Sequence, residues 1–135
     1  MTLQYSVALR NAQLDAIETL IGISAVLKIR TGAAPANVAA ADSGTVLATL
    51  SLPSDWMAAA SSGSKAKAGT WEDTSADATG TAAHFRLYAS DGTTCHAQGT
   101  VTATGGGGDM TVDNTSFAAA QAFTVTGFTI TAGNA

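Results

Sequence analysis

The spacing of apolar residues changes from a helical period to a strand period early in the chain. Near the N-terminus, Val7, Arg10, Leu14, Ile17 and Ile21 follow one another at three- and four-residue steps, and the four apolar residues among them share one stripe. Ser6 precedes this run and is a typical N-cap, and Gly22 suits the left-handed residue that ends a helix. The pattern predicts an amphipathic helix over residues 6–22, whose apolar stripe lies on a sheet or on a neighbouring subunit.

From residue 25 onward, β-branched and aromatic residues dominate and several segments alternate in polarity. The predicted strands cover residues 25–31, 45–52, 84–89, 94–104 and 123–132, with two shorter candidates at residues 65–71 and 110–112. Asp91-Gly92 predicts a hairpin turn. A shift of the apolar phase at Gly127 predicts a bulge. The four glycines at residues 105–108 predict the tip of another hairpin.

Two segments between these strands have different patterns. Residues 53–60, which begin with Pro53-Ser54-Asp55, predict a capped helical turn, and residues 33–41 predict a surface loop. Because no long helical pattern separates the strands, the sequence predicts an antiparallel β-sandwich, jelly-roll-like, with one N-terminal amphipathic helix. We expect a single domain over residues 1–135, with an arm at 1–5, the helix at 6–22 and the sandwich at 25–132.

The composition predicts a domain with a thin core and a weakly charged surface. Among 135 residues there are 29 Ala, 20 Thr and 14 Gly, but only 25 Leu, Ile, Val and Phe together. Six basic and ten acidic residues give a net charge of −4, too few cations for the basic stripe that nucleic acid binding requires. A surface with so few hydrated charges indicates a self-assembling or scaffold-bound protein.

The compartment is suggested only by features that are missing. Cys95 is the single cysteine, so no internal disulfide can form. The first ten residues lack the basic and apolar regions of a secretory signal, and no run approaches the ~18 apolar residues of a membrane span. We therefore expect a soluble protein, made in the cytoplasm, that binds no membrane.

Candidate catalytic and metal-binding residues are few. His84 and His96 could lie on paired strands, but two histidines do not complete a zinc site, and Cys95 points to the opposite strand face from His96. The acidic residues 72–77 lack calcium-loop spacing and favour a solvated loop rich in Asx turns. Neither group makes a metal site.

Two short motifs resemble enzyme signatures without their context. The Ser-x-x-Lys pattern from Ser62 to Lys65 lies in a Ser/Gly loop rather than at a helix start, and the glycines at 105–108 lack the Lys-Ser/Thr of a phosphate loop. The sequence therefore predicts no enzyme, no catalytic residue and no cofactor.

Large apolar residues among small or polar neighbours are candidate contact residues. Leu3 with Tyr5, and Trp56 with Met57, have such neighbours, and we predict that they pack against another chain. Trp71 and Tyr88 lie within strand-like runs and are expected in the core.

Stretches along nearly the whole chain resemble a family of small structural proteins of tailed bacteriophages. The similar motifs are Tyr5-Ser6 with residues 9–16, Ile21-Gly22, residues 27–32 with Pro35, Leu50-x-Leu52-Pro53-Ser54-Asp55-Trp56-Met57, Gly80-Thr81-Ala82-x-His84-Phe85-Arg86-Leu87, residues 90–94 and residues 128–134. The resemblance implies a virion component, a capsid cement or decoration protein on the outer surface of the head that ties major capsid protein subunits together. Such proteins commonly have β-sandwich folds and bind as dimers or trimers.

Two other functions are compatible with residues of this sequence. A tail- or fibre-associated module could recognise a host glycan or another tail protein, and Trp71 with Asp73 and Asp77 would be its candidate site. A small hydrolase would need Ser or Asp beside His84 or His96. The resemblance favours the capsid protein.

Overall fold

The computed structural model describes residues 2–133. Met1, Asn134 and Ala135, which belong to the predicted arm and domain, lie outside the described residues. The elements are α1 (Val7–Ile21), β1 (Val26–Arg30), β2 (Val46–Ser51), β3 (Ser64–Ala66), β4 (Glu72–Asp73), β5 (Gly80–Thr81), β6 (His84–Tyr88), β7 (Cys95–Ala103), β8 (Met110–Val112), β9 (Ser116–Phe117) and β10 (Phe123–Thr131).

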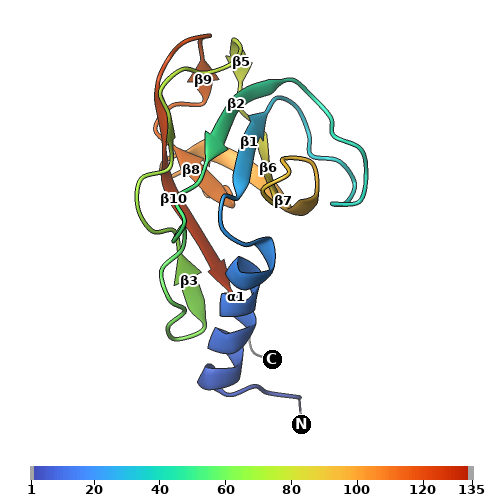
Figure 1. The fold of residues 1–135 in the computed structure, drawn as a ribbon, viewed down its shortest axis with the longest axis vertical. Coiled ribbons are helices and arrows are strands. Elements are labelled where there is room, and N and C mark those ends of the chain that lie inside the picture. The colour runs from blue at the N-terminus through green and yellow to red at the C-terminus, as the bar shows by residue number, and fades with distance from the viewer. Residues whose placement is uncertain (1, 134–135) are drawn as a thin grey trace.

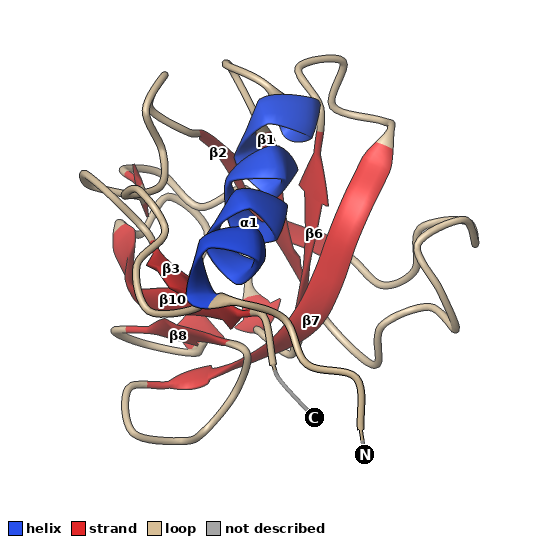
Figure 2. Cartoon of the chain, turned by 90° about the horizontal axis from the view of Figure 1, so that it is seen from below, coloured by secondary structure: helices blue, strands red, loops and turns tan. Residues whose placement is uncertain are grey.

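Most strands belong to one mixed sheet in the order β2-β1-β6-β7-β8-β10-β3, with β4 also paired to β10 and a separate β5-β9 pair. In Figure 1 these strands form a body, and α1 extends below it beside β3 as a stalk. Seen from below in Figure 2, α1 lies between β3, β8 and β10 on one side and β6 and β7 on the other. The helix therefore bridges the two halves of the sheet.

The predicted class, mainly β with one N-terminal helix, is confirmed. The five long predicted strands correspond to β1, β2, β6, β7 and β10, and the hairpin at Asp91-Gly92 joins β6 to β7. The register of β10 against β8 shifts between Val125 and Gly127, which confirms the predicted bulge. The prediction of wholly antiparallel pairing is wrong, because β7 and β8 are parallel.

The glycine-rich connection from β7 to β8 is a tight reversal and not a hairpin tip. Gly105 and Gly107 have φ of 86° and 81°, in the left-handed region that glycine enters most readily. A Cβ on Gly106 or Gly108 would lie 2.7 or 2.9 Å from the Thr102 side chain. The chain thus folds back closely over Thr102, and this brings β8 beside β7 in the parallel direction.

The predicted helical turn at residues 53–60 is wrong, since none of these residues is helical and residues 56–58 pair with residues 66–68. The Ala58 N–H donates to the Ala66 carbonyl at 2.8 Å, and the Ala68 N–H donates to the Trp56 carbonyl at 2.9 Å. A backbone whose hydrogen bonds go to a distant segment cannot also form a helical turn. The same pairing holds Trp56 in the interior.

One face of the β2-β1-β6 part of the sheet is apolar and contributes to the core. Leu27 pairs with Leu50 on one side and Leu87 on the other, so the three side chains share a face. Trp71 lies in the same core, its ring centroid 5.6 Å from that of Phe128. The prediction that Trp71 and Tyr88 are buried is confirmed.

The opposite face carries cations that a loop covers. Arg30 and Arg86 are buried, and both donate to the Asp42 carboxylate, Arg30 at 2.9 Å. The Tyr88 hydroxyl donates to the same carboxylate at 2.7 Å. Arg86 also donates to the Val38 carbonyl at 2.7 Å. The predicted loop at 33–41 is confirmed, and the two arginines hold its backbone and Asp42 on the sheet.

The alkaline limit of stability is expected to depend on Tyr88. Burial, and then the hydrogen bond to Asp42, raise the pKa of Tyr88 from 10.0 to about 12. The unfolded chain therefore loses this proton first, and the free energy of unfolding falls as the pH rises from about 10 through about 12. Urea unfolding at about pH 9 and about pH 11 should show this fall. The free energy of unfolding of the Tyr88→Phe variant should fall less between these pH values. An equal fall in both proteins would contradict the assignment to Tyr88.

Candidate assembly surface

Helix α1 begins and ends at the predicted residues. The Ser6 hydroxyl accepts a hydrogen bond from the Leu9 N–H at 3.1 Å, as an N-cap does. Gly22, with φ of 84°, donates its N–H to the Glu18 carbonyl at 2.8 Å. Both ends of the helix are thus defined by local contacts.

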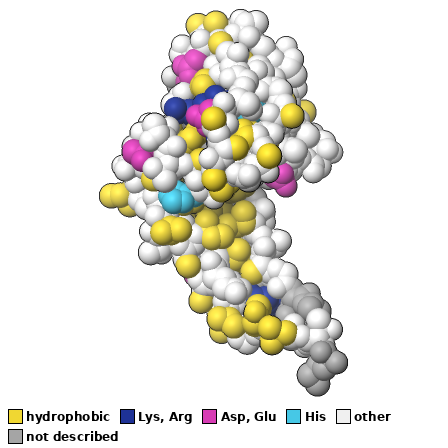
Figure 3. Space-filling view, turned by 90° about the vertical axis from the view of Figure 1, so that its right-hand side faces the viewer, with side chains coloured by type: hydrophobic (Ala, Val, Ile, Leu, Met, Phe, Trp, Pro, Cys, Tyr) yellow, Lys and Arg dark blue, Asp and Glu magenta, His cyan; other side chains and the backbone are white. Residues whose placement is uncertain are grey.

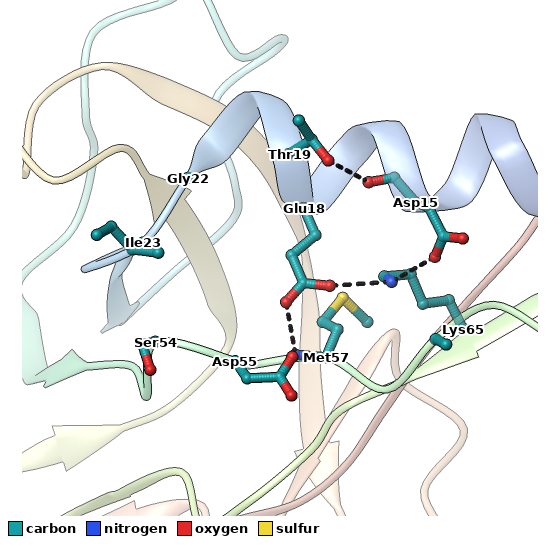
Figure 4. Close-up of a pocket in the computed structure, with 10 residues that line it drawn as sticks. Asp15, Glu18, Thr19, Gly22, Ile23, Ser54, Asp55, Met57 and Lys65 are labelled. Atoms are coloured by element: carbon teal, nitrogen blue, oxygen red, sulfur yellow. Dashed lines mark hydrogen bonds and ion pairs between the residues drawn. The ribbon is translucent and has the colours of Figure 1, made fainter.

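Two acidic side chains of α1 turn inward and hold the helix against β3. The Lys65 ammonium, buried on β3, lies 2.7 Å from Asp15 and 2.9 Å from Glu18 (Figure 4). Asp15 also accepts the Ala60 N–H at 3.0 Å, and Glu18 accepts the Met57 N–H at 3.3 Å. The carboxylates therefore bind both a cation and the backbone of the extended segment.

Arg10 completes this pattern, because it donates to the Ala132 carbonyl at 3.3 Å. Beside it, the Asn11 side chain accepts the Gly63 N–H at 2.8 Å. Arg10, Asp15 and Glu18 are the charged residues of α1, so all three bond across to the body or to β3.

The Lys65–Asp15 ion pair shifts the pKa values of both its members in the stabilising direction. Burial disfavours the charged form of Lys65, but its hydrogen bonds to Asp15 and Glu18 outweigh burial and raise the Lys65 pKa. The hydrogen bond from Lys65, followed by that from the Ala60 N–H, lowers the pKa of Asp15. Both groups stay charged at neutral pH, which keeps the inward side of the helix bonded.

The outer face of α1 has no charged side chain. Its exposed members are Leu9, Ala12, Gln13, Ala16, Thr19 and Leu20. Leu9 and Leu20 are 45% and 73% exposed, and Ile23, just after the helix, is 70% exposed. Figure 3 shows hydrophobic side chains gathered along the stalk. Because solvent-facing helix sides are normally polar or charged, this face has the character of a protein contact surface.

The predicted contact residues are placed in two different environments. Leu3 and Tyr5 lie on the surface before α1, 72% and 39% exposed, and their prediction as contact residues stays a prediction. Trp56 and Met57 are core residues, so their prediction as contact residues is corrected. The Trp56 indole N–H donates to the Gly22 carbonyl at 3.1 Å and thereby ties the end of α1 to the core.

The predicted apolar stripe on the helix is also only half buried. Leu14 and Ile21 face the core, whereas Val7 and Ile17 are 47% and 37% exposed. Sequence reasoning missed Leu9, Leu20 and Ile23 as surface residues of interest. Their signal was present, because they are large apolar residues on the side of the helix away from the stripe.

The histidines are separated in the structure. His84 is buried, and its Nδ1 lies 2.7 Å from the Gly32 carbonyl oxygen. His84 pairs with Thr100 on β7, so His96 lies four residues, or about 13 Å, farther along that strand. The two rings therefore do not converge on one reaction centre.

The candidate glycan site lacks its aromatic platform. Trp71 is in the core, and its indole N–H donates to the Ala68 carbonyl at 3.0 Å. Asp73 accepts the Thr49 N–H at 3.2 Å, and Asp77 accepts the Thr49 hydroxyl at 2.9 Å. These carboxylates hold β2 in place, so the structure contradicts a sugar-binding arrangement of these three residues.

Within residues 2–133, no cluster of three or more His, Cys, Asp or Glu side chains could hold a metal ion. In the same described range, no helix is long and apolar enough to span a membrane. Comparison with known proteins found no matching family model, no similar curated protein and no similar solved structure.

Proposed function

We propose that this protein is a structural, non-enzymatic component of a tailed-phage virion, a capsid cement or decoration protein that binds the outer surface of the head. Its partners are the major capsid protein and copies of itself, as a dimer or trimer. The motifs that resemble phage structural proteins supply the biological setting. The jelly-roll-like sandwich expected for such a protein stays a prediction of this proposal.

The observation that carries the proposal is the uncharged, partly apolar outer face of α1. A contiguous face that includes Leu9 and Leu20 is costly to leave in water, and its burial against a partner would be favourable. Only 12% of the residues are charged, so few hydrated groups oppose such contacts. In a lattice, many modest patches act together and need no tight single site.

Replacing Leu20 by aspartate tests this surface. Burying a leucine contributes about 1.5–3 kcal/mol, so we expect Leu20→Asp to weaken binding to heads at least about tenfold. The measurement is cosedimentation of the purified protein with heads of a phage that encodes it, prepared without it.

Val38→Asp is the matched control, because Val38 is a 40% exposed apolar residue of the 33–41 loop, away from α1. It should bind as the unchanged protein does. Equal binding by Leu20→Asp would contradict the role of this face. Complete virions should contain the protein in a near-stoichiometric ratio to the major capsid protein, and a handful of copies per particle would contradict the cement function.

A further inference from the structure

The main sheet has an opening between β7 and β10. The strand between them, β8, has three residues, whereas β7 and β10 have nine each. It pairs with β7 at residues 101–103 and with β10 at residues 125–128. Beyond β8, residues 95–100 of β7 and 129–131 of β10 flank a space that no strand within residues 2–133 fills.

On the β7 side, the backbone of Gln98 points into this space. The Val101 N–H donates to the Ala83 carbonyl beside β6, and in an antiparallel pair alternate residues turn their N–H and C=O groups to opposite sides. Gln98 therefore directs its N–H and C=O groups away from β6, on the near side of the register shift that lies opposite Leu87 and Tyr88. This part of β7 is a strand edge.

The Thr100 amide shows how the ladder ends at this edge. Its N–H donates to Asp109 Oδ2 at 2.9 Å, and the Asp109 N–H donates to the Thr100 hydroxyl at 3.1 Å. At Thr100, the Asp109 carboxylate thus takes the place of a carbonyl from a neighbouring strand. At Gln98, no strand among the described residues pairs with this edge of β7.

On the β10 side, the same alternation applies. The Ala132 N–H donates to the Gly63 carbonyl on the side of β3. Thr129 and Thr131 therefore turn their N–H and C=O groups toward the space. Two strand edges thus border one opening, and an extended segment placed between them could hydrogen-bond to both.

The space is a groove of about 400 Å³, which we call the open groove. Its lining residues are Leu14, Ile17, Phe85, Ala97, Gln98, Asp109, Phe128, Thr129, Ile130 and Thr131. Asp109 is the single charged residue of this lining. Figure 3 shows hydrophobic side chains gathered where the body narrows into the stalk. The open groove therefore suits an uncharged strand that carries apolar side chains on one face.

We propose that the open groove receives the N-terminal arm, residues 2–5, of a second copy of this chain as an added strand. The arm has the sequence Thr-Leu-Gln-Tyr, so its side chains are uncharged and its apolar residues, Leu3 and Tyr5, alternate. Neither the arm side chains nor most of the groove lining would bring an unpaired charge into the contact. Four residues extend to about 13 Å, enough to span the edge at Gln98 and the three-residue edge at 129–131.

A second copy is the better donor because of where the arm leaves the helix. The open groove lies beside Leu14 and Ile17, whereas the arm precedes Val7 at the far end of the stalk (Figure 1). Ile17 is ten residues, or about 15 Å, along the helix from Val7. The arm of the same chain therefore starts away from the part of the groove beside Ile17, and a second copy can supply an arm to it.

This inference rests on the self-association in the proposed function and names the contact that produces it. Sedimentation equilibrium of the purified full chain should show a dimer or larger assembly. A chain lacking residues 2–5, which keeps the Ser6 cap of α1, should be monomeric, and Leu3→Asp should weaken self-association at least tenfold. A monomeric full chain, or an arm deletion that self-associates unchanged, would overturn the proposal.

Crosslinking identifies the groove directly. In a Cys95→Ser background, one protein carries Leu3→Cys and another carries Ala97→Cys in the open groove. Mixing them under oxidising conditions should produce a disulfide-linked heterodimer. Ala36→Cys, exposed in the 33–41 loop, is the control in place of Ala97→Cys. No more heterodimer than in the control would overturn the arm's placement.

A labelled peptide of residues 2–8 provides a second readout on the arm-deleted chain. The peptide should bind in a fluorescence anisotropy titration, and the same peptide with Leu3→Asp should bind at least tenfold more weakly. Absence of binding would overturn strand addition. These experiments use only the purified chain, so their failure would leave head binding through α1 intact, and a loss of head binding in Leu20→Asp would leave arm exchange intact.

Discussion

Replacing Trp56 by alanine is expected to lower the free energy of unfolding by about 3–5 kcal/mol. The indole is fully buried, and its ring centroid lies 6.0 Å from that of Trp71. Its N–H also holds the Gly22 carbonyl at the end of α1. The substitution therefore leaves a large cavity and detaches the helix end, a loss comparable with much of the 5–15 kcal/mol that stabilises a typical domain.

Chemical denaturation followed by circular dichroism measures this loss. Trp56→Phe is the matched control, because it keeps an aromatic ring but loses the N–H donor, and it should cost about 1–2 kcal/mol. A contact residue on the surface would give the opposite result, with Trp56→Ala unchanged in stability and impaired only in assembly. That outcome would contradict the core position of Trp56.

Replacing Asp42 by asparagine is expected to lower the free energy of unfolding by about 2–3 kcal/mol. Without this carboxylate, Arg30 and Arg86 would remain buried with no anion between them. Breaking a fully buried ion pair costs about 3–5 kcal/mol, and the loss here is smaller because the Asp42 side chain is 39% exposed to water. The loop at 33–41 should become more accessible to proteases at the same time.

A rescue variant separates charge imbalance from damage to the loop. Arg30→Met and Arg86→Met, combined with Asp42→Asn, should recover much of the lost stability, because no buried cation is then left unpaired. Asp55→Asn, at an exposed carboxylate outside this cluster, should leave stability unchanged. A triple variant less stable than Asp42→Asn would contradict the electrostatic account.

The loss of this carboxylate in Asp42→Asn should also change how the free energy of unfolding depends on pH in acid. Burial raises the pKa of Asp42, but hydrogen bonds from Tyr88 and Arg86 outweigh it, so the pKa lies below 3.8. Its stabilising contribution is therefore present above about pH 4 and is lost as the pH falls through the folded-state pKa. The asparagine variant should lose less stability over that acid range than the unchanged protein.

Features that depend on short stretches of chain were predictable. Ser6 and Gly22 mark the helix ends because capping involves backbone groups within a few residues. Asp91-Gly92 marks the hairpin for a similar reason, since Asp91 accepts the N–H groups of Thr93 and Thr94 at 2.9 and 2.8 Å. The bulge at Gly127 is visible as a change in the alternation itself.

Features that depend on residues far apart in the sequence were not predictable. Residues 53–60 resemble a capped turn until residues 66–68 take their hydrogen bonds, and small neighbours made Trp56 look exposed although Gly22 accepts its N–H. The glycines at 105–108 are compatible with a hairpin tip, and only their fit over Thr102 makes β8 parallel to β7.

The candidate contact surfaces also combine features that the sequence predicts with features that only the folded structure decides. The sequence alone establishes an amphipathic helix, an uncharged arm and a weakly charged chain, because these follow from residue order and composition. It could not show that Lys65 draws the acidic side of α1 inward and leaves Leu9 and Leu20 outside, or that β8 ends too early to close the sheet. Both outcomes depend on which distant groups satisfy buried charges and backbone hydrogen bonds, and those partners meet only in the folded chain.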